Sequence, residues 1–486
     1  MSWDPAFETA FHPRVVAMVG ISAKVKIGSP GAVQFYETYQ KLGFPGRIYL
    51  VNATTDELLG QKAYHAVSEI PEPVDLVMVM APTRAIPEIL EDCIKANAKN
   101  VHLFTAGFEE TGEEEGRQLA ARAKEIARRG GLRLIGPNCM GLYVPSSRIG
   151  FMHLPSAQSG PISFAFQSGG HSDWFVNHGP SNGLYFAKGI SFGNGWVLDS
   201  TDFLEYLATD PETKIICLYL EGVKDGRRLF ELVKQVNPKK PVIMWKGGLT
   251  ATGSRAASTH TGSLMGQAAI WEALFAQTGA TQVTSLEELA DTTVTFSFLK
   301  PVKGKNVAVL GMGGGVSVYA ADACAREGLD LPVLSQTTRN ELKKFIPAAG
   351  GSVQNPVDGG SVFMDVSLMA RELELTAADP AIDMLIVMPH LNLARKAGPQ
   401  QVDKLINYLS DFARNNAFGK PAVIVFHSFI DEPWENELRL RLKTELAQQG
   451  VAVYNSLSGA ARALARFAQY HQFIRETRGQ SIKASN

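Results

Sequence analysis

Short apolar runs alternate along the chain with longer stretches in which apolar residues recur at helical spacing. Runs of four or five apolar residues are typical of strands buried in a parallel sheet, and the longer stretches are typical of amphipathic helices. In the first third of the chain the predicted strands span residues 15–19, 48–51, 76–80, 101–104 and 132–135. The helices predicted between them include residues 32–42, 84–96 and 113–129. This regular alternation predicts a doubly wound parallel sheet.

The same alternation recurs twice more. A second set of strands is predicted at residues 162–166, 184–190, 215–220, 242–245 and 281–283, with helices at 265–277 and 285–298. A third set is predicted at residues 307–310, 384–388, 422–426 and 451–454, and the polar residues after 476 are predicted to fray. The segment 300–305, which is polar and contains proline and glycine, predicts a boundary. We therefore predict an α/β chain with a Rossmann-like domain at 1–150 and flavodoxin-like domains at 151–300 and 301–486.

Composition narrows the class of protein. Of the 486 residues 45% are hydrophobic and 20% are charged, and the formal net charge is −1 at pH 7, which disfavours a broad basic surface for nucleic acid. Four widely spaced cysteines without a C-x-x-C pair predict neither a disulfide framework nor a metal site. No apolar run approaches the roughly 20 residues that cross a bilayer, and residues 1–11 lack the pattern of a signal peptide. We predict a cytoplasmic protein without a membrane or nucleic-acid partner.

One histidine, His260, lies in a run of small residues after the predicted strand 242–245. Histidine can attack a phosphoryl group at neutral pH, because its unperturbed pKa of about 6.5 leaves a neutral ring nitrogen available. Glycines on both sides, Gly253 and Gly262, permit backbone conformations that a β-carbon would forbid. The pattern indicates a histidine close to a phosphate, although a histidine in a loop is also commonly structural.

A glycine-rich turn, residues 20–31, follows the first predicted strand. Its backbone N–H groups suit a phosphate, and Lys24 and Lys26 add positive charge. The turn lacks G-x-G-x-x-G, and Asn52 rather than an acid follows the second strand, so a nicotinamide cofactor is disfavoured. The alternative is that these segments are only tight turns.

Two other turns come between a predicted strand and a helix. They contain Gln167, Ser168, Gly169, Gly314, Gly315 and Val316. The first N–H groups of a helix, together with its dipole, can bind an anion without a basic side chain. Glycine-rich turns without a ligand are also common, so these residues alone leave the function open.

Glu221 follows the predicted strand 215–220, which is an unusual place for an acid without a partner. A carboxylate that accepts from an imidazole N–H fixes the tautomer and leaves the other ring nitrogen free to attack phosphorus. The alternative is an acid that faces solvent and pairs with Arg227 or Arg228.

Seven short motifs, in this order, resemble the α-subunit of ADP-forming acyl-CoA synthetases, which are relatives of succinyl-CoA synthetase. The motifs are GPNCMG (136–141), QSG (167–169), SFGN (191–194), YLEG (219–222), STHTGSL (258–264), GGGV (313–316) and NPVD (355–358). The resemblance extends over residues 13–465. It implies a coenzyme A-binding first domain followed by two domains of the succinyl-CoA ligase type.

The resemblance also implies roles for the candidate residues. His260 would carry the phosphoryl group, Glu221 would orient its imidazole, and the phosphate would rest between the two helix ends. Coenzyme A would bind at Gly20, Ser22, Asn52, Pro82, Thr105, Gly107 and Asn138. The implied reaction converts acyl-CoA, phosphate and ADP into carboxylic acid, coenzyme A and ATP.

No P-loop motif occurs in the chain, and the three α/β domains leave no segment for an ATP-grasp fold. The resemblance implies that a β-subunit with that fold supplies ADP or ATP and Mg²⁺, in an α2β2 assembly. One alternative is a catalytically incomplete, coenzyme A-binding regulatory protein. Another is a CoA-transferase or an acylating dehydrogenase, but the latter needs a base-activated cysteine or a dinucleotide fingerprint, and neither is seen.

Three further residues lie in or beside these motifs. His171 and Trp174 follow the glycine turn at 167–169, and His171 either lines an acyl pocket or is a helix histidine without a role in the site. Cys139 lies next to Asn138, but no adjacent base is evident, so we predict a structural cysteine.

Overall fold

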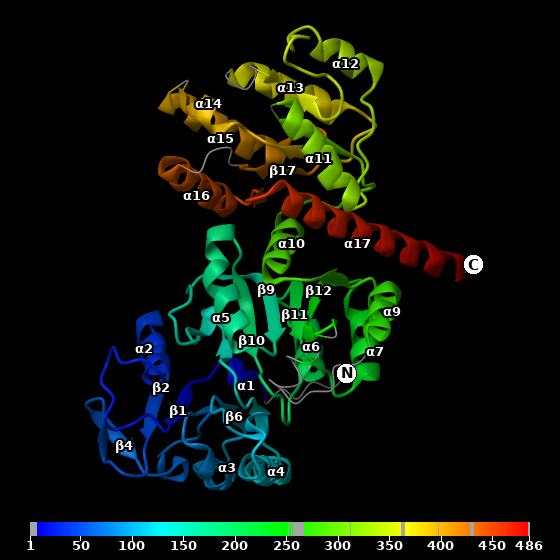
Figure 1. Cartoon of the computed structure of the whole chain (residues 1–486). Helices are drawn as coiled ribbons and strands as arrows, with labels where there is room; N and C mark the ends of the chain where they lie inside the picture. The colour runs from blue at the N-terminus through cyan, green and yellow to red at the C-terminus, as the bar shows by residue number, and fades with distance from the viewer. Residues whose placement is uncertain are drawn as a thin grey trace. The chain divides into compact units, whose positions relative to one another are not determined.

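The computed structural model describes residues 7–250, 252, 253, 255, 267–311, 313–360, 365–396, 398–427 and 432–484. Three β-sheets follow one another along this part of the chain, as Figure 1 shows from blue through green to red. Helices connect most of the strands, which confirms the predicted α/β class with parallel sheets.

In the described residues the first sheet has seven strands in the order β3-β4-β2-β1-β5-β6-β7. They are β1 (Val15–Val19), β2 (Arg47–Val51), β3 (Glu57–Leu58), β4 (Gln61–Tyr64), β5 (Leu76–Val79), β6 (Asn100–Leu103) and β7 (Arg133–Ile135). The five predicted strands are confirmed to within one residue at each end. The antiparallel pair β3 and β4 was not predicted, because these edge strands are short and largely polar.

The helices of this part are α1 (Glu8–Phe11), α2 (Val33–Leu42), α3 (Ile86–Lys95) and α4 (Glu114–Arg129), with short 3₁₀ turns at Val67–Glu69, Thr83–Ala85 and Glu109–Thr111. Helix α4 buries Ala120, Ala123 and Ala127, which recur on one face. Acidic residues in its first turn and arginines in its last turn complement the helix dipole. This orientation leaves the basic end of α4 available at the surface.

The second sheet has six strands among the described residues, in the order β13-β12-β11-β9-β10-β8. They are β8 (Gly141–Tyr143), β9 (Ser159–Phe166), β10 (Phe186–Ser191), β11 (Ile215–Leu220), β12 (Val242–Lys246) and β13 (Thr281–Val283). Its helices are α5 (Gly169–His178), α6 (Ser200–Thr209), α7 (Gly226–Val236) and α9 (Ala268–Thr278), with 3₁₀ turns at Pro145–Ser147 and Pro180–Asn182. The five predicted strands are present, and the unpredicted β8 pairs antiparallel with β10.

The third sheet has five parallel strands among the described residues, in the order β15-β14-β16-β17-β18. They are β14 (Val307–Gly311), β15 (Val357–Asp358), β16 (Met384–Val387), β17 (Ala422–Val425) and β18 (Val453–Tyr454). The helices are α10 (Leu286–Phe298), α11 (Gly314–Arg326), α12 (Gln336–Leu342), α13 (Val366–Ala378), α14 (Leu391–Lys396), α15 (Pro399–Asn415), α16 (Pro433–Gln448) and α17 (Leu457–Ala484). The prediction that the residues after 476 fray is wrong, because α17 continues to Ala484.

The chain forms two compact units. Unit 1 contains residues Met1–His178 and Tyr185–Leu286, and unit 2 contains Gly179–Leu184 and Glu287–Asn486. The first two sheets therefore share one unit, and α10, which was predicted to close the second sheet, groups with the third apart from its first residue. The three-domain division at residues 150 and 300 stays a prediction.

Two hydrophobic clusters in the described part of unit 1 each contain residues from both of its sheet regions. Phe11 of α1 stacks on Tyr206 of α6 with ring centroids 4.2 Å apart, and Phe108 meets Trp196 edge-to-face at 4.7 Å. Such aromatic pairs add to the free energy gained by burying apolar area. The carboxyl edge of the second sheet is thereby fixed against the first. Among the described helices, none is long and apolar enough to span a bilayer.

Candidate functional site

The turn after β9 joins the ends of two strands. The backbone N–H of Gln167 donates to the carbonyl of Tyr219 at 3.1 Å, so this amide belongs to the sheet and is not directed at a ligand. The side-chain Oε1 of Gln167 accepts from the N–H groups of Glu221 and, at 3.0 Å, Gly222. Gln167 therefore holds the residues after β11 in place, a function that its position in a glycine-rich turn did not predict.

Ser168 begins helix α5. Its Oγ accepts from the N–H of His171 at 3.2 Å, as an N-cap residue does. The N–H groups of Gly169 and Gly170 are the first of the helix and have no acceptor within it. A β-carbon at Gly169 would stand 3.2 Å from the side chain of Met140, so glycine permits the close approach of the helix end to the first sheet's final turn. Ser168 and Gly169 thus have the geometry expected of an anion-binding helix end.

Glu221 is buried, with 7% of its surface exposed. The Tyr219 hydroxyl donates to Glu221 Oε1 at 3.0 Å. The alternative of a solvent-facing acid paired with Arg228 is wrong, because Arg228 forms its ion pairs with Asp202 and Glu205. A buried, oriented carboxylate at the end of a central strand can bind an imidazole N–H or another cationic donor.

Lys246 is a site residue that the sequence did not reveal. It is the last residue of β12 and only 3% exposed, and its Nζ donates to the carbonyl of Glu221 at 2.8 Å and to that of Gly247. Burial lowers the pKa of Lys246 to about 8, against the opposing effect of the Glu221 charge. In the sequence, the signal that could have pointed to Lys246 is a cationic residue at the end of an otherwise apolar strand. Lys246 ties the end of β11 to the point where the histidine-containing segment begins.

His260 and residues 256–266 lie outside the described residues. The predicted contact between Glu221 and the imidazole therefore stays a prediction. On the described side of that segment, Gly247 packs against Tyr219, since a β-carbon there would stand 2.8 Å from the Tyr219 hydroxyl oxygen. The segment thus leaves β12 next to the carboxylate that is predicted to orient its histidine.

Aromatic side chains surround this carboxylate. The His171 ring lies 4.7 Å from Tyr219 and 4.8 Å from Trp245, measured between ring centroids. Trp174 instead stacks on His178 at 4.1 Å. His171 consequently packs beside the residue that binds Glu221, whereas Trp174 belongs to the surface of α5. Whether His171 lines an acyl pocket stays a prediction.

The glycine-rich turn between β14 and α11 is in unit 2. Helix α11 begins at Gly314, and its first turn contains Gly315 and Val316. The N–H of Gly313 already donates to Asp358 Oδ2 at 3.0 Å, so a carboxylate stands at the opening of this turn. Glu372 is fully buried nearby, and burial, with the Asp358 charge as a smaller cause, raises its pKa to about 8. The role of this turn in phosphate binding, and the meeting of the two helix ends, stay predictions.

A cavity of about 550 Å³ opens at the carboxyl edge of the first sheet, a volume within the usual range for a small-molecule site. The residues predicted to contact coenzyme A that line it are Gly20, Ser22, Asn52 and Pro82. The other residues predicted to contact coenzyme A do not line this cavity; they are Thr105, Gly107 and Asn138. The cavity therefore accounts for the β1, β2 and β5 ends of the predicted site.

The side chains in this cavity also hold its turns. Asn52 Nδ2 donates to the carbonyl of Ile21 at 2.8 Å, and Asn52 Oδ1 accepts from Thr54. The hydroxyl of Ser22 accepts from the N–H of Lys24 at 3.3 Å. These bonds fix the shape of the concave surface. Because the Asn52 side-chain amide is already hydrogen-bonded, a ligand there would contact mainly backbone groups and apolar atoms.

The remaining predicted residues link the first sheet to the second. Thr105 Oγ1 donates to the carbonyl of Ala81 at 2.7 Å, and its own carbonyl accepts from the N–H of Asn138 at 3.1 Å. The N–H of Gly107 donates to the carboxylate of Glu110 at 2.8 Å. The turn at 136–140 leads to Met140, which contacts the start of α5. Hydrogen bonds and contacts thus connect the strand ends at the cavity with Gly169 at the start of α5.

Cys139 is buried, and burial raises the pKa of its thiol above the ordinary range. A thiol that stays protonated is a poor nucleophile, which agrees with the structural role predicted for it. Among the described residues no cluster of three histidine, cysteine or acidic side chains could hold a metal ion.

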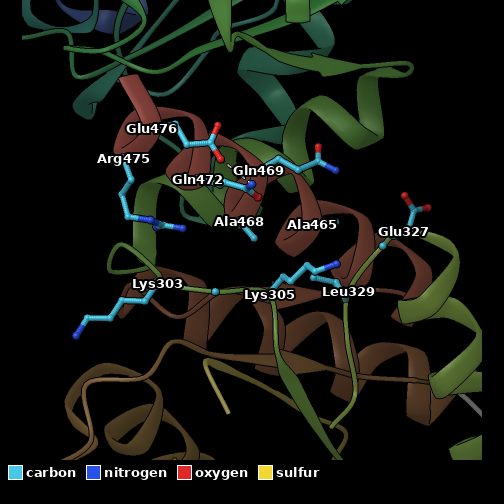
Figure 2. Close-up of a pocket in the computed structure, with 12 residues that line it drawn as sticks. Lys303, Lys305, Glu327, Leu329, Ala465, Ala468, Gln469, Gln472, Arg475 and Glu476 are labelled. Carbon is cyan, nitrogen blue, oxygen red and sulfur yellow. Dashed lines mark hydrogen bonds between the residues drawn. The ribbon is translucent and has the colours of Figure 1, made fainter. Parts of the chain in front are cut away.

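Unit 2 contains a separate cavity of about 330 Å³ (Figure 2). Figure 2 shows Lys303 and Lys305 on the loop before β14, with the Lys303 side chain directed away from helix α17. Lys305 forms an ion pair with Asp330 at 3.2 Å, and Arg475 donates to the carbonyl of Val302 at 2.6 Å. This cavity lies at the amino end of β14, whereas ligands of doubly wound sheets bind beyond the carboxyl ends. It is therefore not the candidate site.

Comparison with known proteins supports the interpretation of the first domain as a CoA-binding domain and of the second as a domain of the succinyl-CoA ligase type. Residues 14–145 match the family model of a CoA binding domain, and residues 159–296 match that of the succinyl-CoA ligase like flavodoxin domain. The chain is 35% identical over 470 residues to the α subunit of ADP-forming acetate–CoA ligase II of Pyrococcus furiosus, covering 94% of this chain and 97% of that one. The chain belongs to the family of ADP-forming acyl-CoA ligases.

Two further similar proteins are a longer ligase and an acetyl-coenzyme A synthetase of known structure. ADP-forming acetate–CoA ligase I of Archaeoglobus fulgidus is 36% identical over 387 residues, which cover 78% of this chain but only 54% of that longer protein. The dinucleotide-forming acetyl-coenzyme A synthetase 1 of Candidatus Korarchaeum cryptofilum, solved with phosphate and ADP, has a TM-score of 0.81 at 29% identity. This similarity covers 97% of our chain and 98% of that chain.

Proposed function

We propose that this chain is the α-type subunit of an ADP-forming acyl-CoA ligase, which interconverts acyl-CoA, phosphate and ADP with a carboxylic acid, coenzyme A and ATP. The family supports the class of reaction. The observation that carries the proposal is the contact between Gly169 and Met140, since it brings the anion-binding end of α5 to the final turn of the CoA-binding sheet. Glu221 is tied to the same turn through Gln167.

The first chemical step takes place where these elements meet. An oxygen of phosphate attacks the thioester carbon, the C–S bond breaks, and coenzyme A leaves as the thiolate or thiol while an acyl phosphate forms. The free amides of Gly169 and Gly170 would hold the phosphate oxygens, because helix N-termini favour negative charge. Positioning and charge stabilisation supply most of the rate in such transfers.

His260 then receives the phosphoryl group. A ring nitrogen forms a bond to phosphorus, the bond from phosphorus to the acyl oxygen breaks, and the carboxylate leaves. Glu221 would accept from the other ring nitrogen and stabilise the charge that develops on the imidazole. The phosphohistidine finally passes its phosphoryl group to ADP.

The nucleotide site is proposed to come from a second subunit with an ATP-grasp fold, which would also hold Mg²⁺, in an α2β2 assembly. Two facts support a partner. The counterpart in Pyrococcus furiosus is itself a subunit α, and the Archaeoglobus fulgidus ligase extends well beyond the part that this chain matches.

Isotope labelling tests the proposal. Purified chain incubated with acyl-CoA and ³²P-phosphate is expected to acquire a base-stable, acid-labile phosphate, whereas γ-³²P-ATP alone is expected to leave it unlabelled. Adding an ATP-grasp subunit should then permit labelling by ATP. No label from acyl-CoA and phosphate would favour the incomplete, CoA-binding regulator. Strong labelling by ATP alone would contradict a nucleotide site supplied by a partner.

Replacing Gly20 by alanine is expected to weaken binding of coenzyme A to the chain, as measured by isothermal titration calorimetry. Gly20 has φ +95°, and a β-carbon there would stand 2.6 Å from the backbone nitrogen of Ala81, so the turn that lines the cavity must shift. The left-handed conformation by itself costs a non-glycine residue about 1–3 kcal/mol.

Gly28→Ala is the matched control for that conformational cost. Gly28 has φ +87°, but no atom lies within 4 Å of the position of its β-carbon. Thermal unfolding should show a loss of stability in both variants, with a fall in affinity for coenzyme A confined to Gly20→Ala. Equal affinities in the two variants would rule out the steric argument.

A further inference from the structure

A second cavity in unit 1, of about 640 Å³, lies between helix α4 and the segments that follow β9, β10 and β11. Its basic side chains are Arg117, Lys124, Arg128 and Lys224. Gln167 and Gly222, which flank the candidate site, also line it. It is separate from the cavity predicted for coenzyme A, with which it shares no residue.

The two acids in the lining offset only part of this positive charge. Glu109 forms an ion pair with Lys124 and accepts from the indole N–H of Trp196 at 2.9 Å. Asp199 caps helix α6 by accepting from the N–H of Thr201 at 2.9 Å. Both carboxylates are therefore engaged. Lys124 pairs with Glu109, and Arg117 pairs with Glu114 at 2.9 Å.

Arg128 and Lys224 are the two remaining cations of the cavity. Neither forms an ion pair with a carboxylate in the described part of the chain. Lys224 Nζ donates only to carbonyl oxygens, those of Gly195 and, at 3.1 Å, Trp196. Desolvation lowers the pKa of Lys224, the charges of Asp199 and Asp202 raise it, and those of Lys124 and Arg128 lower it. A bound anion would relieve this repulsion between like charges.

The basic side chains of the lining favour a negatively charged ligand. Phe192 and Trp196 are 1% and 3% exposed, so neither offers an open face for a base or an acyl chain. Cations in a concave site attract an oxyanion and raise its local concentration. Among the substrates of the proposed reaction, only inorganic phosphate is a multiply charged anion without an organic part.

We propose that this cavity binds inorganic phosphate next to the reaction site, with Arg128 and Lys224 as its main ligands. The inference rests on the proposed function for the identity of the anion. Gln167 and Gly222 line the cavity and are hydrogen-bonded to each other at 3.0 Å, so phosphate held there would lie at the carboxyl ends of β9 and β11.

Equilibrium dialysis of the full chain with ³²P-phosphate, without acyl-CoA, tests the site directly. Arg128→Gln should weaken phosphate binding by roughly tenfold, in line with the loss of one charge-assisted bond. Arg129→Gln is the matched control, because Arg129 is the next residue of α4, is exposed, and pairs with Glu91. It should bind phosphate as the unchanged chain does. Lys224→Gln should weaken phosphate binding in the same way as Arg128→Gln.

Steady-state kinetics with the ATP-grasp partner give an independent readout. Arg128→Gln should raise the KM for phosphate by roughly tenfold and leave the KM for acyl-CoA unchanged. Equal phosphate affinity in Arg128→Gln and Arg129→Gln would overturn the inference, as would displacement of bound phosphate by acetate or coenzyme A at similar concentration. If acyl-CoA and phosphate fail to label the chain while dialysis still shows an Arg128-dependent site, the proposed function fails and the phosphate site stands.

Discussion

Replacing His260 by alanine is expected to abolish both the phosphorylation of the chain by acyl-CoA and phosphate and the formation of ATP with the partner subunit. In the proposed mechanism the imidazole forms the bond to phosphorus, so its removal leaves no acceptor for the phosphoryl group of the acyl phosphate. Binding of coenzyme A should be unchanged, because the cavity at the β1, β2 and β5 ends is distant in the sequence and belongs to another sheet. Radiolabel incorporation and calorimetry measure the two properties separately.

Two additional variants make this result specific. His260→Asn keeps a polar side chain and should be as inactive as His260→Ala. His153→Asn changes a solvent-exposed histidine that pairs with Asp173 at 2.8 Å, and it should be labelled as the unchanged chain is. ATP formation by His260→Ala would remove this histidine from the mechanism.

The apolar pattern predicted the parts of the fold that are buried on both faces. Strands such as β1 and β11 consist entirely of buried residues, so the sequence signal coincides with the structural cause. Strands β3, β8 and β15 have only two or three residues, too few to show a period. These strands form because they pair with a neighbouring strand, and such pairing cannot be recognised from the local sequence.

The candidate site was predicted less completely than the fold. Motif order made Gln167 and Glu221 candidates, but it did not predict that the Gln167 side chain accepts from the backbone N–H of Glu221. Lys246 was missed because its importance depends on carbonyl groups of two strands. The basic cavity is built from residues of four separate segments, and only the fold brings them together.

Glu221→Gln is expected to lower the rate at which acyl-CoA and phosphate label His260 by about 10²-fold or more, the range typical of proton-transfer partners. Glutamine keeps the size of the side chain and an oxygen that can accept from the Tyr219 hydroxyl, as Glu221 Oε1 does at 3.0 Å. The backbone bonds of residue 221 to Gln167 and Lys246 are also independent of the side chain. The substitution therefore removes the negative charge while leaving the local structure intact.

Tyr219→Phe separates orientation from charge at the same carboxylate. It removes the hydroxyl that donates to Glu221 but keeps the charge and the aromatic packing against His171 and Trp245. Its labelling rate should therefore fall less than that of Glu221→Gln, with both variants unfolding near the temperature of the unchanged chain. Single-turnover labelling measures the two rates. If Glu221→Gln is labelled at the normal rate, the carboxylate only fills space beside the aromatic cluster, and another group must stabilise the imidazole during phosphoryl transfer.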